Sequence, residues 1–209
     1  MRTKRIGVMG GTFDPIHVGH LVAAEEARVR FALDRMVFVP CGQPPHKKDY
    51  SVTDREHRYT MTVLATSTNS AFEVSRIEID RPGPSYTVDT LRELRGAQPQ
   101  SSLYFVTGGD GILAVLTWRD PHELVQFCEF IAVTRPGYDL SHLEQALDPE
   151  LMRHVHLLPI PGIDISSTEI RRRVAAGLPV KYLTPLEVEA YIAKQGLYRD
   201  DRSAGREGG

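Results

Sequence analysis

With 209 residues, 41% of them hydrophobic, the chain is long enough to bury a core without disulfides or metal sites. Its formal net charge of −2 excludes a general basic field for nucleic acid, so any anion site must come from a local cluster. The two cysteines, Cys41 and Cys128, form no CxxC spacing, which argues against a disulfide framework or a zinc site. No apolar run is long enough for a signal peptide or a membrane span, so we expect a cytoplasmic protein with no membrane partner.

Short apolar segments alternate with helix-like segments in the first half of the chain. Glycine and proline end the strands, and Thr53-x-x-Glu56 is a capping box that opens a helix. The prediction in chain order is strand 4–9, helix 19–33, strand 35–40, loop 41–52, helix 53–68, strand 72–79 and helix 85–95.

The same alternation continues in the second half. Two more capping boxes, Ser166-x-x-Glu169 and Thr184-Pro-x-Glu187, open helices near the C-terminus. The prediction in chain order is strand 103–107, a helix starting at Pro121, strand 130–134, strand 154–158, helix 166–177 and helix 184–196. We expect a single domain over residues 1–199 and a disordered tail over 200–209, which is charged and glycine-rich.

The order of elements predicts an α/β fold, a Rossmann-like doubly wound parallel sheet with a small helical C-terminal portion. In such folds ligands bind at the carboxyl ends of the strands. The loops 10–17, 41–50, 108–111 and 135–137 all follow predicted strands, so we expect the site there. Association into a homo-oligomer stays open at this point.

The segment Gly10–His20 (GGTFDPIHVGH) follows the first strand and has the features of a phosphate site. It begins with two glycines, whose backbone N–H groups can approach a phosphate closely, and Thr12 adds a hydroxyl. His17 and His20 are three residues apart at the start of a helix, near the positive end of its dipole. A tight turn with a capping histidine would explain any one of these residues, and a zinc site would need a third ligand.

The segment Ile165–Arg171 (ISSTEIR) places three hydroxyl side chains at a helix N-terminus and an arginine one turn later. Backbone N–H groups, hydroxyls and a guanidinium together can hold a triphosphate. Taken alone, Ser166 is only a helix N-cap.

These two segments resemble the GxFDPxHxGH and ISSTxIR signatures of the HxGH nucleotidyltransferases, a superfamily of Rossmann-like adenylyl- and cytidylyltransferases. Within it the chain is similar to the bacterial nicotinate-nucleotide adenylyltransferases from about residue 4 to residue 198. The resemblance implies transfer of AMP from ATP to nicotinate mononucleotide, giving deamido-NAD and pyrophosphate in NAD biosynthesis. The catalytic residues that it implies are His17, His20, Lys47 and Arg171.

Further segments match this family: PPHKK at 44–48, GPSYTVDTL at 83–91 and FVTGGD at 105–110. The implied ATP-binding residues are Gly10, Gly11, Thr12, Phe13, His17, His20, Gly108, Asp110, Ile165, Ser166, Ser167, Thr168 and Arg171. The implied substrate-binding residues are Lys47, Ser85, Tyr86, Thr87, Trp118 and Arg135. A lone tryptophan is more often part of a core. Arg58 is a weaker candidate for the site, and a surface ion pair is the alternative for it. Gly111 stands where we expect a residue with a side chain, and a role for His46 stays open.

The expected reaction is in-line attack on the α-phosphorus of ATP without a covalent intermediate, in which the histidines, Lys47 and Arg171 supply hydrogen-bond donors and positive charge. Mg²⁺ is the expected cofactor, held mainly by ATP phosphates and water rather than by protein ligands. Three alternatives remain: a phosphopantetheine adenylyltransferase, a non-catalytic nucleotide sensor and, least consistent with the charge, an RNA-binding module.

Overall fold

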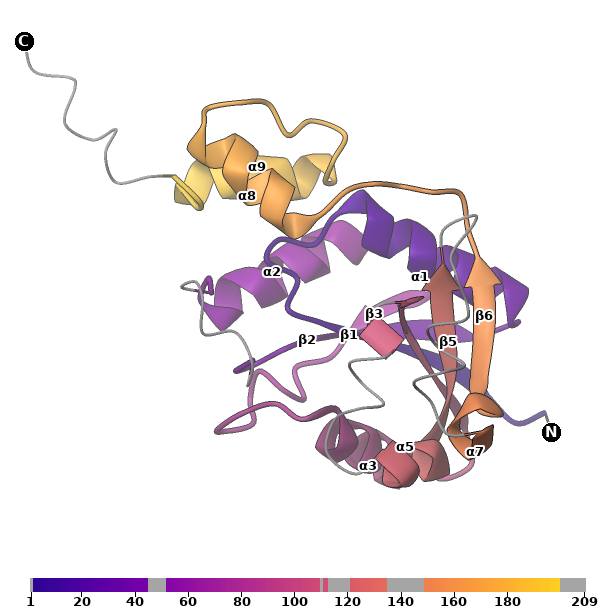
Figure 1. The fold of residues 1–209 in the computed structure, drawn as a ribbon. Helices are drawn as coiled ribbons and strands as arrows, with labels where there is room; N and C mark the ends of the chain where they lie inside the picture. The colour runs from indigo at the N-terminus through magenta and orange to yellow at the C-terminus, as the bar shows by residue number, and fades with distance from the viewer. Residues whose placement is uncertain (1, 45–51, 110, 113–120, 135–148, 200–209) are drawn as a thin grey trace, which may run out of the picture.

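The computed structural model describes residues 2–44, 52–109, 111–112, 121–134 and 149–199. The elements in chain order are β1 (Arg5–Gly11), α1 (Val18–Arg30), β2 (Arg35–Pro40), α2 (Arg55–Thr66), β3 (Phe72–Val74), α3 (Thr87–Ala97), β4 (Ser102–Gly108), α5 (Pro121–Phe127), β5 (Cys128–Thr134), α7 (Pro149–Met152), β6 (Val155–Pro159), α8 (Ser167–Ala175) and α9 (Leu186–Gln195) (Figure 1). The short helix α7 was not predicted. The predicted tail, 200–209, lies outside the described residues.

The strands form one six-stranded sheet in the order β3-β2-β1-β4-β5-β6, and every neighbouring pair is parallel. The strand order reverses at β1, which pairs with β2 on one side and β4 on the other. This is the doubly wound Rossmann order, and it confirms the predicted fold class. The carboxyl ends of all six strands therefore lie at the same edge of the sheet.

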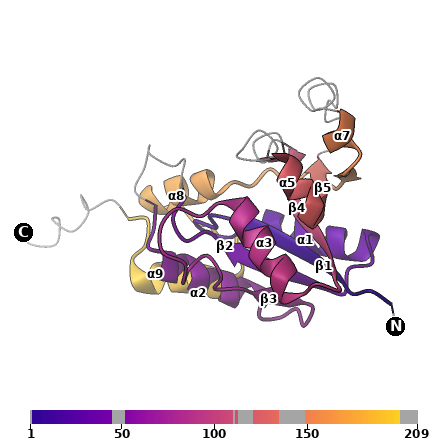
Figure 2. The same ribbon diagram turned by 90° about the horizontal axis from the view of Figure 1, so that it is seen from below.

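Side chains of successive strand residues point to opposite faces, and each face carries its own core. Ile6 and Val8 pack on the face covered by α3, α5 and α7, whereas Met9 packs on the face covered by α1, α2 and α9. Figures 1 and 2 show these two groups of helices on either side of the sheet. The C-terminal helix α9 packs against α2, so the last described residues lie beside the first half of the fold.

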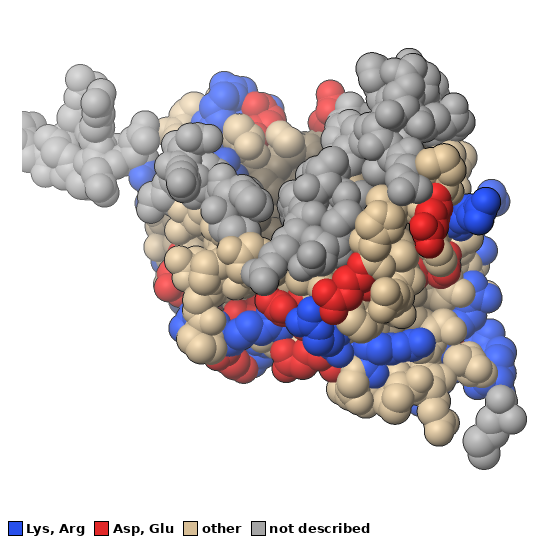
Figure 3. Space-filling view, turned by 60° about the horizontal axis from the view of Figure 1, so that its bottom comes forward, with Lys and Arg blue, Asp and Glu red and all other residues tan. Residues whose placement is uncertain are grey.

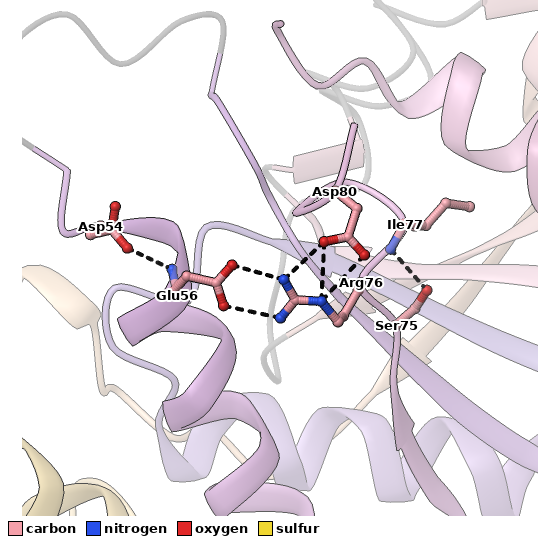
Figure 4. Close-up of polar contacts among 6 residues, drawn as sticks. All are labelled: Asp54, Glu56, Ser75, Arg76, Ile77 and Asp80. Atoms are coloured by element: carbon pink, nitrogen blue, oxygen red, sulfur yellow. Dashed lines mark hydrogen bonds and ion pairs between the residues drawn. The ribbon is translucent and has the colours of Figure 1, made fainter. Parts of the chain in front are cut away.

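The strand β3 is shorter than predicted, because it ends at Val74 and a polar turn follows. In that turn the Arg76 guanidinium donates to Glu56 at 2.8 Å and to Asp80 at 2.8 Å (Figure 4). Both carboxylates raise the pKa of Arg76, with the hydrogen bonds that Arg76 donates to Glu56 contributing most. The turn is thus tied to the N-terminus of α2. The apolar alternation that predicted a strand to residue 79 continues in the sequence after β3 has stopped pairing with β2.

The helix N-caps only partly follow the predicted capping boxes. Ser166 accepts a hydrogen bond from the Glu169 N–H at 3.1 Å, as predicted. The cap of α2 is Asp54 rather than Thr53, since the Asp54 side chain accepts from the Glu56 N–H. The third prediction was wrong, because α9 has Pro185 at its N-cap and no side-chain cap bond.

On the face shown in Figure 3, basic and acidic side chains are interspersed over the described surface. Ion pairs such as Arg81–Glu93 and Arg92–Glu123, at 2.8 and 2.7 Å, join charged side chains of the described surface. Among the described residues, no helix combines the length and the apolar character that a bilayer crossing requires.

Candidate active site

A pocket of about 300 Å³ opens at the carboxyl edge of the sheet. Its walls come from the ends of β1, β4 and β5, from the start of α1 and from the segment between β6 and α8: Met9, Gly10, His17, Gly19, His20, Ala23, Val106, Thr107, Gly108, Val133, Thr134, Ile160, Pro161, Ile163 and Ile165. Mostly apolar walls with a few polar groups are typical of small-molecule sites. The position is the one that the fold predicts for a ligand.

The two histidines of the first motif form a stacked pair in this pocket. The ring centroids of His17 and His20 are 3.7 Å apart, with 29° between the planes. His17 is the N-cap of α1 in extended conformation, and its backbone N–H donates to His20 Nδ1 at 3.2 Å. A Cβ on the intervening Gly19 would lie 3.1 Å from the His17 ring, a tight contact that the ring would relieve only by shifting.

Both imidazoles are neutral at pH 7. Burial lowers the pKa of His17 to about 4, and only 8% of this residue is exposed. Burial, and then the charge of His17, lower the pKa of His20 well below its ordinary value. Because His20 Nδ1 accepts a hydrogen bond, the His20 proton is on Nε2. In the unliganded protein the two histidines therefore offer N–H dipoles, and the positive charge predicted for this site would come from Lys47 and Arg171.

His17 Nδ1 is buried and has no hydrogen-bond partner among the described residues. Buried polar atoms in folded proteins nearly always have a partner, so an unpaired one needs an explanation. The capping box at the start of α1 places the His17 side chain against the His20 backbone N–H, which accounts for its position.

The first-motif loop, residues 12–16, connects β1 to α1 and is held by side chains from other parts of the chain. Four of its carbonyl oxygens accept hydrogen bonds from side chains elsewhere: Thr12 from Arg58 at 2.8 Å, Asp14 from Arg171 at 2.7 Å, Pro15 from Ser167 at 2.9 Å and Ile16 from Thr184 at 2.8 Å. The peptide bond between Asp14 and Pro15 is cis. Phe13 is buried with φ +50°, and its ring fills the space that a Cβ on Gly11 would need.

These contacts bring the two sequence motifs together, although more than 150 residues separate them. Ile165 lines the pocket, Ser166 caps α8, and Ser167 bonds to the first-motif loop. Arg171 also donates to Thr168 Oγ1 at 3.3 Å. Placement of the second motif beside the first is thus a finding, whereas contact of these residues with ATP stays a prediction.

The segment predicted to bind the substrate lies at the start of α3, away from the pocket lining. Ser85 is buried, and its Oγ accepts from the N–H groups of Gly42 at 3.1 Å and Gln43 at 3.2 Å. Tyr86 is the N-cap of α3, and it packs against the core. Thr87 is the first residue of the helix. Ser85 therefore joins the loop after β2 to α3, and substrate contact by this segment stays a prediction.

Several predicted site residues lie outside the described residues: Lys47, Asp110, Trp118, Arg135 and, less firmly predicted, His46. Gly108 is described and lines the pocket. The unexpected Gly111 has a packing explanation, because a Cβ there would lie 2.3 Å from Thr107 Oγ1.

Arg58 is the residue that sequence reasoning underestimated. It is 1% exposed, and its guanidinium donates to the carbonyls of Thr12, Gly42 and Thr53 at 2.8 to 2.9 Å. Burial lowers its pKa. The surface ion pair was thus the wrong alternative. A signal was present, because Arg58 stands on the buried stripe of α2 with positions 61, 62, 65 and 66, where apolar residues are the norm.

Comparison with known proteins agrees with this architecture. A profile of the cytidylyltransferase-like family matches residues 8–173. Proteins named as nicotinate-nucleotide adenylyltransferases from Moorella thermoacetica and Thermoanaerobacter sp. are 57% and 50% identical, over 95% and 98% of this chain and 93% and 99% of their own lengths. One from Saccharopolyspora erythraea is 53% identical over the whole chain and 96% of its own length.

Among solved structures, Plasmodium falciparum nicotinic acid mononucleotide adenylyltransferase in complex with NaAD has a similar fold. Its TM-score is 0.73 at 24% identity, covering 93% of this chain and 97% of that one. At this identity the likeness supports the fold alone. The profile and the close relatives go further: the chain belongs to the cytidylyltransferase-like family and, within it, to the nicotinate-nucleotide adenylyltransferases.

Proposed function

We propose that this protein transfers the AMP group of ATP to nicotinate mononucleotide, releasing pyrophosphate and forming nicotinate adenine dinucleotide. Its relatives at 50–57% identity carry this activity in their names. The reaction places the protein in NAD biosynthesis.

The observation that carries the proposal is the convergence of two helix N-termini and two histidines on one pocket. His17 and His20 begin α1, and Ile165 directly precedes the N-cap of α8; all three line the same cavity. Helix N-termini offer unpaired N–H groups and positive partial charge, which suit phosphate groups. The apolar walls beside them suit a nucleoside.

The chemistry follows from this arrangement. A phosphate oxygen of nicotinate mononucleotide attacks the α-phosphorus of ATP in line; a new P–O bond forms, and the bond to the β-phosphate oxygen breaks as pyrophosphate leaves. The attacking phosphate is largely dianionic at neutral pH, since its second pKa is about 6, so no general base is needed. Catalysis then consists of positioning and charge stabilisation. His20 Nε2–H is a donor for this purpose, and Arg171 and Lys47 add positive charge.

We expect Mg²⁺ to enter as part of the substrate, as Mg–ATP. The described residues contain no group of three or more His, Cys, Asp or Glu side chains that could hold a metal ion. Asp14, a buried carboxylate of the first-motif loop, already accepts hydrogen bonds from Tyr198 and from the Thr53 N–H. ATP phosphates and water are therefore the proposed ligands, and we assign no step to a protein-bound metal.

The nicotinate group is proposed to bind near the start of α3, where backbone N–H groups of Tyr86 and Thr87 can meet its carboxylate. Ser85 supports this position, because its hydroxyl fixes the Gly42 backbone against α3. Trp118 and Arg135 complete the proposed substrate site.

The test measures pyrophosphate release from ATP with nicotinate mononucleotide, nicotinamide mononucleotide and phosphopantetheine as separate acceptors. We expect the highest kcat/KM with nicotinate mononucleotide. It differs from nicotinamide mononucleotide by a carboxylate in place of an amide, and a few hydrogen bonds to that group set the preference. Preference for phosphopantetheine, or ATP binding without turnover on any acceptor, would overturn the proposal.

A further inference from the structure

The C-terminal end of the described chain reaches the first-motif loop through one tyrosine. Tyr198 Oη donates to Asp14 Oδ1 at 2.8 Å, across 184 residues of sequence. Asp14 is 1% exposed, and its other oxygen, Oδ2, accepts from the Thr53 N–H at 3.3 Å. A buried carboxylate requires such donors, so the Tyr198 phenol is part of what keeps this side chain in place.

The backbone of Tyr198 is held in a conformation that favours glycine. Gly196 ends α9 in the left-handed region with φ +64°, and Tyr198 itself has φ +63°. Non-glycine residues stay in this region where the surrounding contacts determine it, often at functional sites. Burial and the neighbouring Asp14 charge also raise the pKa of the Tyr198 phenol, which keeps it protonated as a donor.

Asp14 is the point at which these contacts reach the candidate active site. Its backbone carbonyl accepts from Arg171 at 2.7 Å, while its carboxylate accepts from Tyr198. Three residues further along, His17 enters the pocket. A change in the position of Asp14 therefore moves Arg171 and the approach to His17 together.

We propose that Tyr198 is a positioning residue for ATP: acting through the Asp14 carboxylate, it fixes the first-motif loop in the conformation that presents His17 and Arg171 to the nucleotide. The proposal rests on the proposed function of this site. The Tyr198 hydroxyl contacts Asp14 and, at 3.9 Å, the Met61 sulfur, and we assign neither residue to the acceptor substrate.

The chain contains a matched control in the same helical portion. The Tyr191 hydroxyl, on α9, hydrogen-bonds with His57 Nδ1 on α2 at 2.8 Å. This contact also joins the C-terminal portion to the first half of the fold, but it does not involve the first-motif loop. Tyr198→Phe and Tyr191→Phe each remove one hydroxyl and keep the ring.

The experiment compares the two variants with the wild-type protein in thermal unfolding, in steady-state kinetics and in direct titration with ATP. We expect both to lower Tm modestly. Tyr198→Phe should reduce kcat/KM for ATP about tenfold, as expected for loss of a hydrogen bond to a charged group, and weaken ATP binding. KM for nicotinate mononucleotide should change less than twofold in Tyr198→Phe, and all kinetic constants of Tyr191→Phe should stay within twofold of wild type.

Asp14→Asn and the double variant Asp14→Asn/Tyr198→Phe complete the design as a double-mutant cycle. We expect the double variant to lose no more kcat/KM than Asp14→Asn alone, because the two residues act through one contact. Equal kinetics and equal ATP affinity in Tyr198→Phe and wild type, or fully additive losses in the cycle, would overturn the inference. Wild-type protein that binds ATP but does not adenylate nicotinate mononucleotide would instead contradict the proposed function, and the ATP titration would still decide the role of Tyr198.

Discussion

His17 and His20 differ in hydrogen bonding although their rings stack. His20 Nδ1 accepts from the backbone, so its Nε2–H is fixed in direction as a donor. His17 Nδ1 is buried, and its side chain faces the backbone N–H of His20 in the capping box of α1. At the residue scale, the pair is therefore a preorganised set of neutral dipoles, which costs little reorganisation when charge develops on a bound phosphate.

Replacement of His20 by alanine tests this arrangement. We expect His20→Ala to fold normally but to lose roughly 10²-fold in kcat, as for the loss of one preorganised donor to a transition state. His156→Ala is the control, since His156 bonds to Glu129 on the sheet and lines no part of the pocket. Steady-state pyrophosphate release and Tm of both variants decide the matter; near-wild-type kcat in His20→Ala would contradict the role.

The lowered pKa of His17 also predicts a pH dependence of stability. The unfolded chain binds the His17 proton near pH 6.5 and the folded chain only near pH 4, so between these values the unfolded state holds more protons. Stability is therefore complete above pH 6.5 and decreases as pH falls, by about 2 kcal/mol from this residue at pH 5. Urea unfolding measures the free energy of unfolding at pH 7 and at pH 5. The change in this free energy between the two pH values should be smaller in His17→Gln than in wild type. An equal change in both proteins would show that His17 is not the group responsible.

At the scale of elements, α2 connects three parts of the site. Through Arg58, its first turns reach the first-motif loop at Thr12 and the loop after β2 at Gly42. A planar guanidinium has several N–H donors and can bond to three carbonyls that lie in different directions. A lysine ammonium on a flexible stem would hold the same three carbonyls less well. The helix thus joins the first-motif loop to the start of the loop that follows β2.

Loss of the Arg58 guanidinium leaves three carbonyls without their donor. Each unsatisfied buried group costs about 1–3 kcal/mol, so Arg58→Met should lower the free energy of unfolding by about 3 kcal/mol or more. Arg55→Met, at an exposed position of the same helix, should change it by less than about 0.5 kcal/mol. Denaturant unfolding measures both, and equal values for the two variants would mean that Arg58 is not a structural centre of the site.

Sequence patterns predicted elements where local physics determines them. The central strands β1, β2, β4 and β5 are apolar runs, and both the runs and the final glycine cap at Gly196 were readable. Where tertiary contacts compete, prediction failed: β3 yields to the Arg76 turn, and the Thr184 hydroxyl bonds to Ile16 rather than capping α9. A hydroxyl can satisfy a helix end or a distant carbonyl, and the local sequence does not distinguish these.

At the scale of the whole molecule, the site joins the two ends of the chain. The motifs at Gly10–His20 and Ile165–Arg171 were found from the sequence, but their contacts with each other were not. The roles of Arg58 and Tyr198 are set by partners far away in sequence, and for Tyr198 no pattern indicated the partner. Sequence reasoning thus located the two motifs but not the contacts that hold them together.

Nucleotide binding should therefore protect both ends of the chain together. A non-hydrolysable ATP analogue at 100 times its Kd should stabilise the fold by about 2.7 kcal/mol. Hydrogen exchange should slow at the first-motif loop and the start of α1, and also at residues 160–171, because both regions line or support the pocket. Protection confined to the N-terminal region would contradict a shared site.

The bracing of the first-motif loop has a consequence for biosynthesis. The ribosome makes Asp14 early and Tyr198 184 residues later, with Ser167, Arg171 and Thr184 also near the end. At 5–20 residues per second, this interval is roughly 10 to 40 s. During that time the loop has the early donors Arg58 and the Thr53 N–H but lacks the late ones. A prematurely terminated chain never acquires them, so abortive translation products should not compete with the finished enzyme for ATP.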